Sequence, residues 1–403
     1  MLTVNSELLH DYDEVFDFVV SKAKVITETE ILSLTQLSDR VLAEEVISPL
    51  NLPSHSISAM DGYGFSTKAI KEWLPVVKTV FAGRPTEGIS SRKSVRIMTG
   101  AMIPEGVDCV IPQENAFVQQ GDTEPLLRNP DGDEAVKSGQ HIKMIGSDVK
   151  KGESLLEKGH LIRSQDIALL ASVGLSQASV YKKVKVVVLV SGDELASPGE
   201  PLNPGQIYDA NSWLIGDLIK QLPAELLAVE TLPDKAEKIK ETMLKWDQQA
   251  DLLITIGGAS VGQKDHVKTV LTSLKKFWSW KLNMKPAKPF SMAQLSHSTL
   301  VALPGNPLAA FMSFQLFAKS LIQKSAGLVS WQNRPLILPL LDGYAVHGNK
   351  TQWLQVKRVA MGLQPIENGS SSQLSKLVEA SGYIRIHPDK TYPKACLVEF
   401  WAY

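Results

Sequence analysis

The chain has 403 residues, of which 44% are hydrophobic and 21% are charged. This composition is that of a globular protein and excludes a disordered, collagen-like or disulfide-rich chain, and the length predicts about two or three domains. Because 42 basic residues are balanced by 43 acidic ones, no global positive field would attract nucleic acid or an anionic membrane. Any anion site must therefore be built locally.

The N-terminal stretch is acidic and lacks the basic and apolar segments of an export or organelle address. No apolar run approaches the roughly 18 residues that are needed to span a bilayer. Cys109 and Cys396 lie far apart and lack the close spacing of a metal site, so we expect buried free thiols, with a single disulfide as the alternative. We therefore expect a cytoplasmic protein that binds neither membrane nor nucleic acid.

The N-terminal part of the chain shows two kinds of pattern. Apolar residues recur with helical spacing over 8–24 and 37–46, which predicts helices within the first 50 residues. From 51 to 140, short alternating apolar runs interrupted by Gly and Pro predict a small β-rich module. A short helix is expected over 165–172, with Ser164 as its N-cap and Gly174 at its end.

The middle of the chain alternates between buried strands and helices, which predicts right-handed βαβ units around a parallel sheet. The expected strands are 183–190, 225–232, 251–258 and 298–305, and the expected helices are 211–222, 234–248, 265–274 and 306–326. After residue 333 the pattern becomes β-rich again and predicts a small C-terminal β domain.

Ligands of an open parallel sheet bind beyond the carboxyl ends of its strands, and here those ends carry unusual loops. The first strand runs into Ser191 and Gly192 and then two acids, Asp193 and Glu194, either of which could hold a cation. The next strand end offers backbone N–H groups for an anion and precedes an acid that could hold a cation, and its residues are Gly257, Gly258, Ser260 and Asp265. The alternative is an ordinary turn with helix-capping acids.

Two further segments favour an anion site. A stiff loop precedes the last helix of the alternating region and consists of Pro304, Gly305, Asn306 and Pro307, of which the last two also suit a plain helix start. Lys285 and Lys288 lie three residues apart in a proline-stiffened stretch, where fixed cations would suit an oxyanion, although a solvated lysine pair is the alternative.

Loops in the β-rich module add Asp61 and Thr99, each of which alone is more typical of a turn. The histidines lack a metal-binding spacing, and the dinucleotide, Walker A and hydrolase-elbow patterns are all missing. Together the acids, glycines and lysines predict a site for a phosphorylated ligand with Mg²⁺, without naming the substrate.

A series of stretches, in this order, resembles the molybdopterin molybdenumtransferases, the MoeA family, to which the E domain of gephyrin is related. The stretches are SAMDGYGF (58–65), RIMTGAMIPEG (96–106), SGQHIKMIGSDV (138–149), SGDEL (191–195), GQIYDAN (205–211), DLLITIGGASVGQKD (251–265), KPAKPF (285–290) and LPGNPLAA (303–310). The resemblance extends over essentially the whole chain, and the first two stretches and the domain order distinguish this family from others that share the α/β domain.

The resemblance implies a multidomain α/β and β fold around a central parallel sheet. Its parts would be a discontinuous helical N-terminal domain (1–50 and 141–180), a β-rich module (51–140), a molybdopterin-binding α/β domain (181–327) and a C-terminal β-barrel (328–403). It also implies a homodimer in which each active site lies between the α/β domain of one subunit and the β-rich module of the other.

The implied activity is a step of molybdenum cofactor biosynthesis. The transferase would insert molybdenum from molybdate into adenylylated molybdopterin and release AMP with Mg²⁺, after an upstream molybdopterin adenylyltransferase as a possible partner. By resemblance, Glu194 and Asp265 would hold Mg²⁺, and Asp61, Thr99, Asp148 and Asp234 would complete the catalytic set. Ser191, Gly192, Gly257, Gly258 and Ser260 would bind phosphate, Lys285 and Lys288 molybdate, and Ser372 would lie near the molybdate pocket.

The chain departs from the family pattern in three places. Val190 stands where a Ser precedes the usual Thr-Gly-Asp-Glu, which removes one hydrogen-bond donor. Ala287 stands at a usual glycine, a mild change unless the position needs a positive φ. Lys350 and Gln355 stand where the C-terminal domain usually offers arginines, so oxyanion capture could be weaker or select tungstate. The changes at the Ser-Thr and arginine positions leave open a non-catalytic molybdopterin carrier, and the shared α/β domain leaves open a nucleotide pyrophosphatase.

Overall fold

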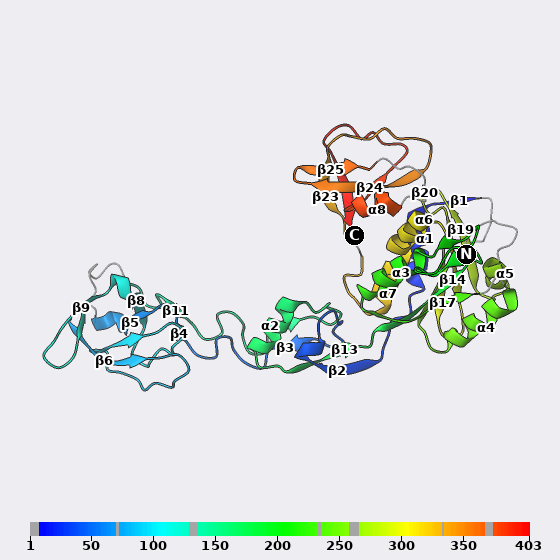
Figure 1. Ribbon diagram of the computed structural model, residues 1–403. Coiled ribbons are helices and arrows are strands. Elements are labelled where there is room, and N and C mark those ends of the chain that lie inside the picture. Colours follow the sequence, from blue (N-terminus) through cyan, green and yellow to red (C-terminus); the bar gives the residue numbers. More distant parts are fainter. Residues whose placement is uncertain are drawn as a thin grey trace.

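The computed structural model describes residues 8–69, 72–128, 136–232, 235–257, 266–332, 334–366 and 374–403. The chain is elongated, as Figure 1 shows, with a β-rich module at one end and an α/β unit and a C-terminal β unit at the other. A small unit of short strands and one helix lies between them. None of the helices in the described ranges is long and apolar enough to cross a membrane.

The β-rich module is a six-stranded sheet with strand order β8-β5-β7-β6-β10-β9. Its strands are β5 (Gly62–Phe65), β6 (Leu74–Val80), β7 (Ser94–Ile97), β8 (Cys109–Pro112), β9 (Phe117–Gln119) and β10 (Leu126–Arg128). Alternating apolar residues such as Val95, Ile97 and Val110 are fully buried in it, which confirms the β-rich character that the sequence predicted. Cys109 is a free buried thiol, and Cys396 is free and partly buried.

The small unit joins two distant stretches of chain through short antiparallel pairs. Its elements are β2 (Thr29–Ser33), β3 (Val46–Ile47), β12 (Ser154–Leu156), α2 (Ser164–Ser172) and β13 (Gln177–Tyr181), while β4 (Ile57–Ser58) and β11 (Ile142–Lys143) pair beside the β-rich module. Helix α2 confirms the predicted helix. Its N-cap is Arg163 rather than Ser164, and Gly174 follows its end at a φ of 79°.

The predicted helix over 37–46 is wrong. The segment is irregular and extended, and its apolar side chains Leu37, Val41 and Leu42 are nonetheless buried. Val41 and Leu42 form bridges to Leu161 and Val180, more than a hundred residues away along the chain. Helical spacing of apolar residues cannot reveal such pairing, and here the distant partners took up the backbone hydrogen bonds that a helix would have used.

The α/β unit is built on a seven-stranded sheet with strand order β1-β19-β21-β22-β18-β14-β17. The strands are β1 (Leu9–His10), β14 (Val184–Ser191), β17 (Ala224–Leu232), β18 (Leu252–Ile256), β19 (Phe277–Leu282), β21 (Pro289–Gln294) and β22 (Thr299–Leu303). The predicted strands β14, β17, β18 and β22 are confirmed and pair in parallel. The sheet is mixed rather than purely parallel, because β21 runs antiparallel between β19 and β22.

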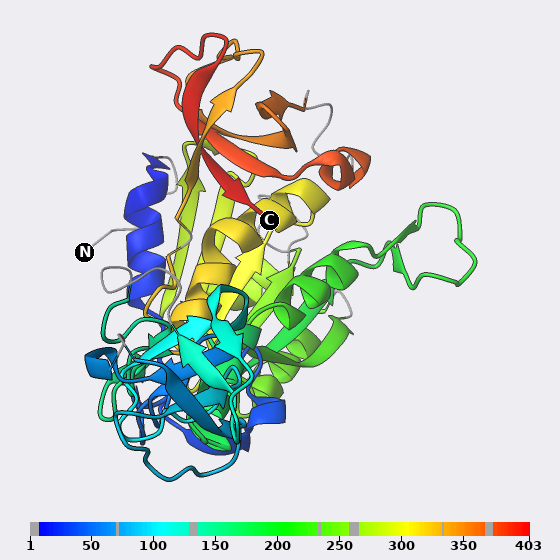
Figure 2. The ribbon, with the colours of Figure 1, turned by 90° about the vertical axis from the view of Figure 1, so that its left-hand side faces the viewer.

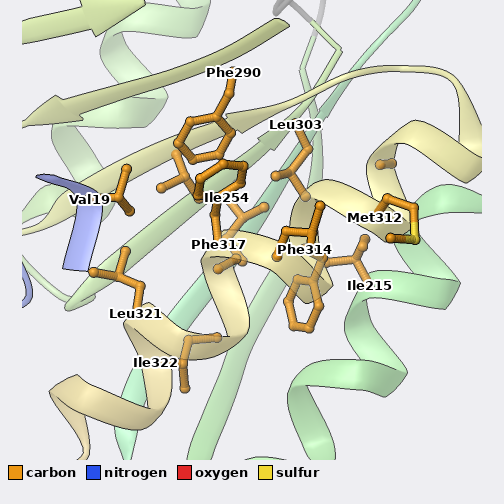
Figure 3. Packing of buried hydrophobic residues seen from close by; sticks show 14 of the residues in the cluster. Val19, Ile215, Ile254, Phe290, Leu303, Met312, Phe314, Phe317, Leu321 and Ile322 are labelled. Carbon is orange, nitrogen blue, oxygen red and sulfur yellow. The ribbon is translucent and has the colours of Figure 1, made fainter. Parts of the chain in front are cut away.

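Helices cover both faces of this sheet, as the alternating pattern predicted. One face carries α1 (Tyr12–Ser21), α3 (Asn211–Lys220) and the long helix formed by α6 (Pro307–Ser313), a π-helical turn (Phe314–Ala318) and α7 (Lys319–Ser325). Figure 3 shows Phe314 and Phe317 of that helix packed towards Ile254, Phe290 and Leu303 of the sheet. The other face carries α4 (Ala236–Asp247) and α5 (His266–Thr272).

Helix α1 packs on the α/β unit, whereas the family resemblance predicts that all of residues 1–50 belong to the N-terminal domain. Val15 and Val19 are fully buried in the main core of the sheet, and β1 pairs in parallel with β19. An amphipathic helix buries its apolar stripe on whichever apolar surface is in reach, so its own pattern does not name the surface. In Figure 2 α1 runs beside the sheet, at the edge opposite α3.

The C-terminal unit is a closed five-stranded barrel, which confirms the predicted barrel. Its strands are β23 (Leu336–Leu340), β24 (Thr351–Val359), β25 (Gly362–Pro365), β26 (Gly382–Ile386) and β27 (Cys396–Ala402), and a pairing between β24 and β26 closes the ring. The short strand β20 (Met284–Lys285) of the α/β unit pairs in parallel with β24. A short helix, α8 (Leu374–Glu379), lies beside the barrel.

Candidate active site

The first half of the site is a pocket at the carboxyl ends of the neighbouring strands β14, β18 and β22. A cavity of about 100 Å³ lies there, lined by Ser191, Glu194, Ile256, Gly305 and Pro307 among others. We call it the glycine pocket. Parallel strands bring their carboxyl ends to one sheet edge, so residues separated by more than a hundred positions meet. The structure therefore brings together the predicted residues Ser191, Glu194, Gly305 and Pro307.

Close backbone approach explains the glycines of this pocket. Gly257 has a φ of 90°, and a Cβ atom there would lie 2.9 Å from the carbonyl oxygen of Ser191. A Cβ on Gly305 would lie at an ordinary contact distance of 3.8 Å from the Cα of Gly257, and the N–H of Gly257 donates to the carbonyl oxygen of Leu303 at 3.1 Å, so the two strand ends lie side by side. A Cβ on Gly192 would lie 2.9 Å from both carboxylate oxygens of Glu194, which therefore folds back over the loop. Bare backbone is what a phosphate needs for contact with N–H groups.

Asn211 is a site residue that the sequence reasoning did not select, although it lies within the family-like stretch GQIYDAN. Its side-chain amide donates a 2.7 Å hydrogen bond to the carbonyl oxygen of Gly305 and so holds the proline-stiffened loop. The amide oxygen of Asn211 is buried and, among the described residues, has no hydrogen-bond donor. That acceptor is free for a donor on a ligand. Asn306 occupies the N-cap position of α6 and Pro307 its first turn, as predicted.

The second half of the site is a group of lysines at the same edge of the sheet. Ser291 of β21 pairs with Ala302 of β22, so the start of β21 lies beside the end of β22, and Lys288 immediately precedes β21. Lys285 lies in β20, where it pairs with Gln352 of the barrel. A cavity of about 610 Å³ opens here, lined by Lys285, Asp342, Gly343, Tyr344, Ala345, His347, Gln352 and Pro365.

Lys350 of the barrel and Lys281 lie near Lys288, and we call these three, together with Lys285 in the lining of the cavity, the lysine cluster. The positive charge of the nearby Lys350 lowers the pKa of Lys288, and burial and the charge of Lys281 act in the same direction. Among the described residues, no carboxylate offsets this effect. The repulsion between Lys288 and Lys350 favours an anion between them, although Asp342 lines the same cavity as Lys285.

The departures from the family pattern have structural consequences. Ala287 is 3% exposed and has a φ of 64°, so it occupies a conformation that favours glycine and that costs an L-residue about 1 kcal/mol or more. Because this position has a positive φ, the replacement of the usual glycine by Ala287 is not a mild change. Gln355 is 2% exposed inside the barrel, so it is a core residue that does not line the lysine cavity.

Asp61 and Thr99 form a small acidic feature in the β-rich module. The carboxylate of Asp61 accepts hydrogen bonds of 2.7 Å from the backbone N–H of Thr99 and 2.8 Å from its hydroxyl. Chiefly because of the backbone bond, the pKa of Asp61 is lowered. Asp148 is exposed and makes no hydrogen bond to this pair, although its N–H donates to the carbonyl oxygen of Leu52 at 3.0 Å.

Within one chain, this acidic feature does not meet the glycine pocket. The β-rich module lies at the opposite end of the molecule from β14 and its neighbours (Figure 1). The residues Asp234, Gly258, Ser260, Asp265 and Ser372, which complete the predicted set, lie outside the described residues. In the described ranges no group of three or more His, Cys, Asp or Glu side chains could hold a metal by itself.

Comparison with known proteins places these features in one family. Residues 10–174 match the family described as MoeA N-terminal region (domain I and II), and residues 187–324 match a probable molybdopterin binding domain. The chain is 40% identical to the molybdopterin molybdenumtransferase of Haemophilus influenzae over 77% of this chain and 76% of that protein. The chain is 32% identical to the enzyme of the same name from Bacillus subtilis, over 73% of this chain and 70% of that protein.

The fold gives the same assignment. A crystal structure of the molybdopterin biosynthesis MoeA protein from Pyrococcus horikoshii superposes with a TM-score of 0.83 and 25% identity, and covers 98% of this chain and 100% of that one. Gephyrin of Dictyostelium discoideum is 29% identical over 78% of this chain but only 49% of its own length.

Proposed function

The chain belongs to the MoeA family of molybdopterin molybdenumtransferases, and from that premise we propose that it inserts molybdenum from molybdate into adenylylated molybdopterin and releases AMP. The observation that carries the proposal is the presence, at one edge of one sheet, of both a glycine pocket and a cluster of mutually repelling lysines. The first suits a phosphorylated ligand and the second a compact dianion.

The glycine pocket would hold the phosphate end of the substrate. Gly257, whose own N–H donates to the carbonyl oxygen of Leu303, allows the close approach of the Ser191 backbone, and Ser191 lies in the lining of the cavity. The free acceptor on Asn211 could take a hydrogen bond from a ribose hydroxyl or a pterin N–H. Donors fixed before the reaction stabilise the charge that develops on phosphate oxygens when the adenylate bond breaks.

The pocket also suits Mg²⁺. This ion is usually held by one or two carboxylates together with phosphate oxygens of the substrate, rather than by a cage of protein ligands. Glu194 supplies one carboxylate at the rim of the pocket, and the predicted second ligand is Asp265. When bound, the ion would withdraw charge from the phosphate oxygens.

The lysine cluster would bind molybdate. A dianion between Lys288 and Lys350 would replace their mutual repulsion by attraction to both. The cluster draws one of its members from the barrel, so both the α/β unit and the barrel would be needed for binding. A lysine ammonium attracts an oxyanion by its charge, but it lacks the two parallel donors of the arginine guanidinium that is common in the family. We therefore expect the site to distinguish less well between molybdate and tungstate.

The acidic feature would come from a second copy of the chain. Asp61 and Thr99 lie far from the glycine pocket of their own chain (Figure 1), and a homodimer would place them at the pocket of the partner. An adenylyltransferase reaction must supply the substrate, and we place both activities in the cytoplasm.

The direct test is AMP release from adenylylated molybdopterin in the presence of Mg²⁺, with and without molybdate. We expect release that depends on molybdate in the wild type and is lost in Glu194→Gln. A matched control is Glu200→Gln, in the same loop but outside the glycine pocket, which should behave as the wild type. Tight binding of the substrate without AMP release under any condition would make the protein a carrier and contradict the proposal.

A further inference from the structure

The lysine cluster depends on a junction of three chain segments that are distant in sequence. The N–H of Asn283 donates to the carbonyl oxygen of His10 at 2.9 Å, and the N–H of Thr351 donates to the carbonyl oxygen of Asn283 at 3.2 Å. These bonds connect the N-terminal strand β1, the lysine-bearing segment and the barrel strand β24 in series. Lys350 immediately precedes Thr351, so its position follows that of β24.

An ion pair fixes the same junction from the other side. The guanidinium of Arg385 donates to both carboxylate oxygens of Asp13, each at 2.9 Å. Asp13 lies in the first turn of α1, just after β1, and Arg385 lies in β26 directly opposite Trp353 of β24. The pair therefore ties the start of the chain to the barrel strand that carries Lys350.

Only one member of this ion pair is buried, because the Arg385 side chain is 12% exposed and that of Asp13 is 61% exposed. The Arg385 Cζ atom lies beside the rings of Tyr12 and Trp353, at 5.3 Å and 5.5 Å from the two ring centres. Its Nε group has no hydrogen-bond acceptor among the described residues. Without Asp13 the guanidinium would be a buried cation without a counter-charge, and the barrel would have to shift to hydrate it.

We propose that Asp13 and Arg385 are a positioning pair, which sets the place of Lys350 relative to Lys288 and thereby the affinity of the lysine cluster for oxyanions. The inference rests on the proposed function, because it takes the cluster to be the molybdate site. Neither residue would contact the anion. Their effect would pass through β26 and β24 and appear as a change in anion affinity rather than in the chemical step.

The test is calorimetric titration of the full-length protein with sodium molybdate, together with AMP release at varied molybdate concentration. We expect Asp13→Asn to bind molybdate about fivefold more weakly, in the range found for residues that act on a site through intervening structure. The rate at saturating molybdate should fall less than the affinity. Asp13→Glu keeps the carboxylate and should restore most of the affinity, whereas Arg385→Lys loses the fork and should resemble Asp13→Asn.

Two control variants distinguish a failure of the positioning role from a failure of the proposed molybdate site. Glu28→Gln removes an exposed ion pair with Lys182 in the small unit and should leave molybdate affinity unchanged. Lys288→Ala should abolish measurable binding. Wild-type affinity in Asp13→Asn and Arg385→Lys, with binding lost in Lys288→Ala, would overturn the positioning role and leave the proposed function intact. Wild-type affinity in Lys288→Ala would overturn the molybdate site itself.

Discussion

The glycine pocket and the lysine cluster lie at the same edge of one sheet but are built in different ways. The pocket is made of backbone, at the ends of parallel strands, and its geometry depends on two strand ends that lie side by side at Gly257 and Gly305. The cluster is made of long side chains that converge from the α/β unit and the barrel. A site made of backbone should lose its ligand when a side chain enters it. A site made of side chains should lose its ligand when the strands that carry those side chains move.

The largest expected effect is on the backbone site. Gly257→Val would place a branched side chain at a φ of 90° and within 2.9 Å of the Ser191 carbonyl oxygen, so the loop must move. Displacement of a ligand by about 1 Å can cost about a hundredfold in rate, and we expect at least that loss of AMP release. Gly199→Val, at a φ of 96° in a different loop (197–206) and with open space around it, is the control for backbone strain. Equal losses in both would show that backbone strain, not the pocket, is responsible.

Lys288→Ala should have the next largest effect, because it removes the lysine that faces Lys350 and Lys281. We expect molybdate affinity to fall by about thirtyfold or more, since truncation of a charge in a close pair commonly has an effect of this size. Lys276→Ala, in the same unit but outside the cluster, should bind molybdate normally. The binding constants from titration would distinguish the two.

Ala287→Gly tests the backbone that supports the lysine cluster, because Ala287 directly precedes Lys288. Relief of the positive φ should raise the free energy of unfolding by about 1 kcal/mol. Ala168→Gly, in the exposed middle of α2, should lower it by about the same amount. Denaturant titration of both variants gives the two signs, and equal destabilisation by both would contradict the strain at Ala287.

The smallest effect should come from Thr99→Val. The Thr99 backbone and hydroxyl groups lower the pKa of Asp61, so the carboxylate stays ionised to a more acidic pH than usual. Loss of the hydroxyl bond should raise this pKa towards its ordinary value and move the acidic limb of the pH–rate profile to higher pH. The rate at neutral pH should change little, and Thr99→Ser should keep the wild-type profile.

The sequence predicted the backbone site better than the side-chain site, for a physical reason. Strands β14, β18 and β22 are continuous apolar runs, and glycine and proline punctuate their ends, so both the sheet and the loops could be inferred locally. Lys285 and Lys288 form a pair in the sequence and Lys350 stands at a family arginine position, but only the fold shows that Lys350 lies near Lys288.

The wrong predictions have the same origin. The apolar spacing of Leu37, Val41 and Leu42 is compatible with a helix, and only distant pairing partners show that the segment is extended. Strands β19 and β21 were missed because their runs mix Trp, Lys, Ser and Pro, and antiparallel pairing with each other and with β22 stabilises them. The site residue Asn211 carried one signal, its place in a family-like stretch.

The central claim is that each active site combines the glycine pocket of one chain with Asp61 and Thr99 of another. Mixed dimers test it directly. Asp61→Asn and Glu194→Gln should each be inactive in AMP release alone. When the two are unfolded and refolded together, mixed dimers contain one intact site, so we expect about a quarter of the wild-type rate. No activity in the mixture, with dimers of both kinds present, would place the whole site within one chain and contradict the account.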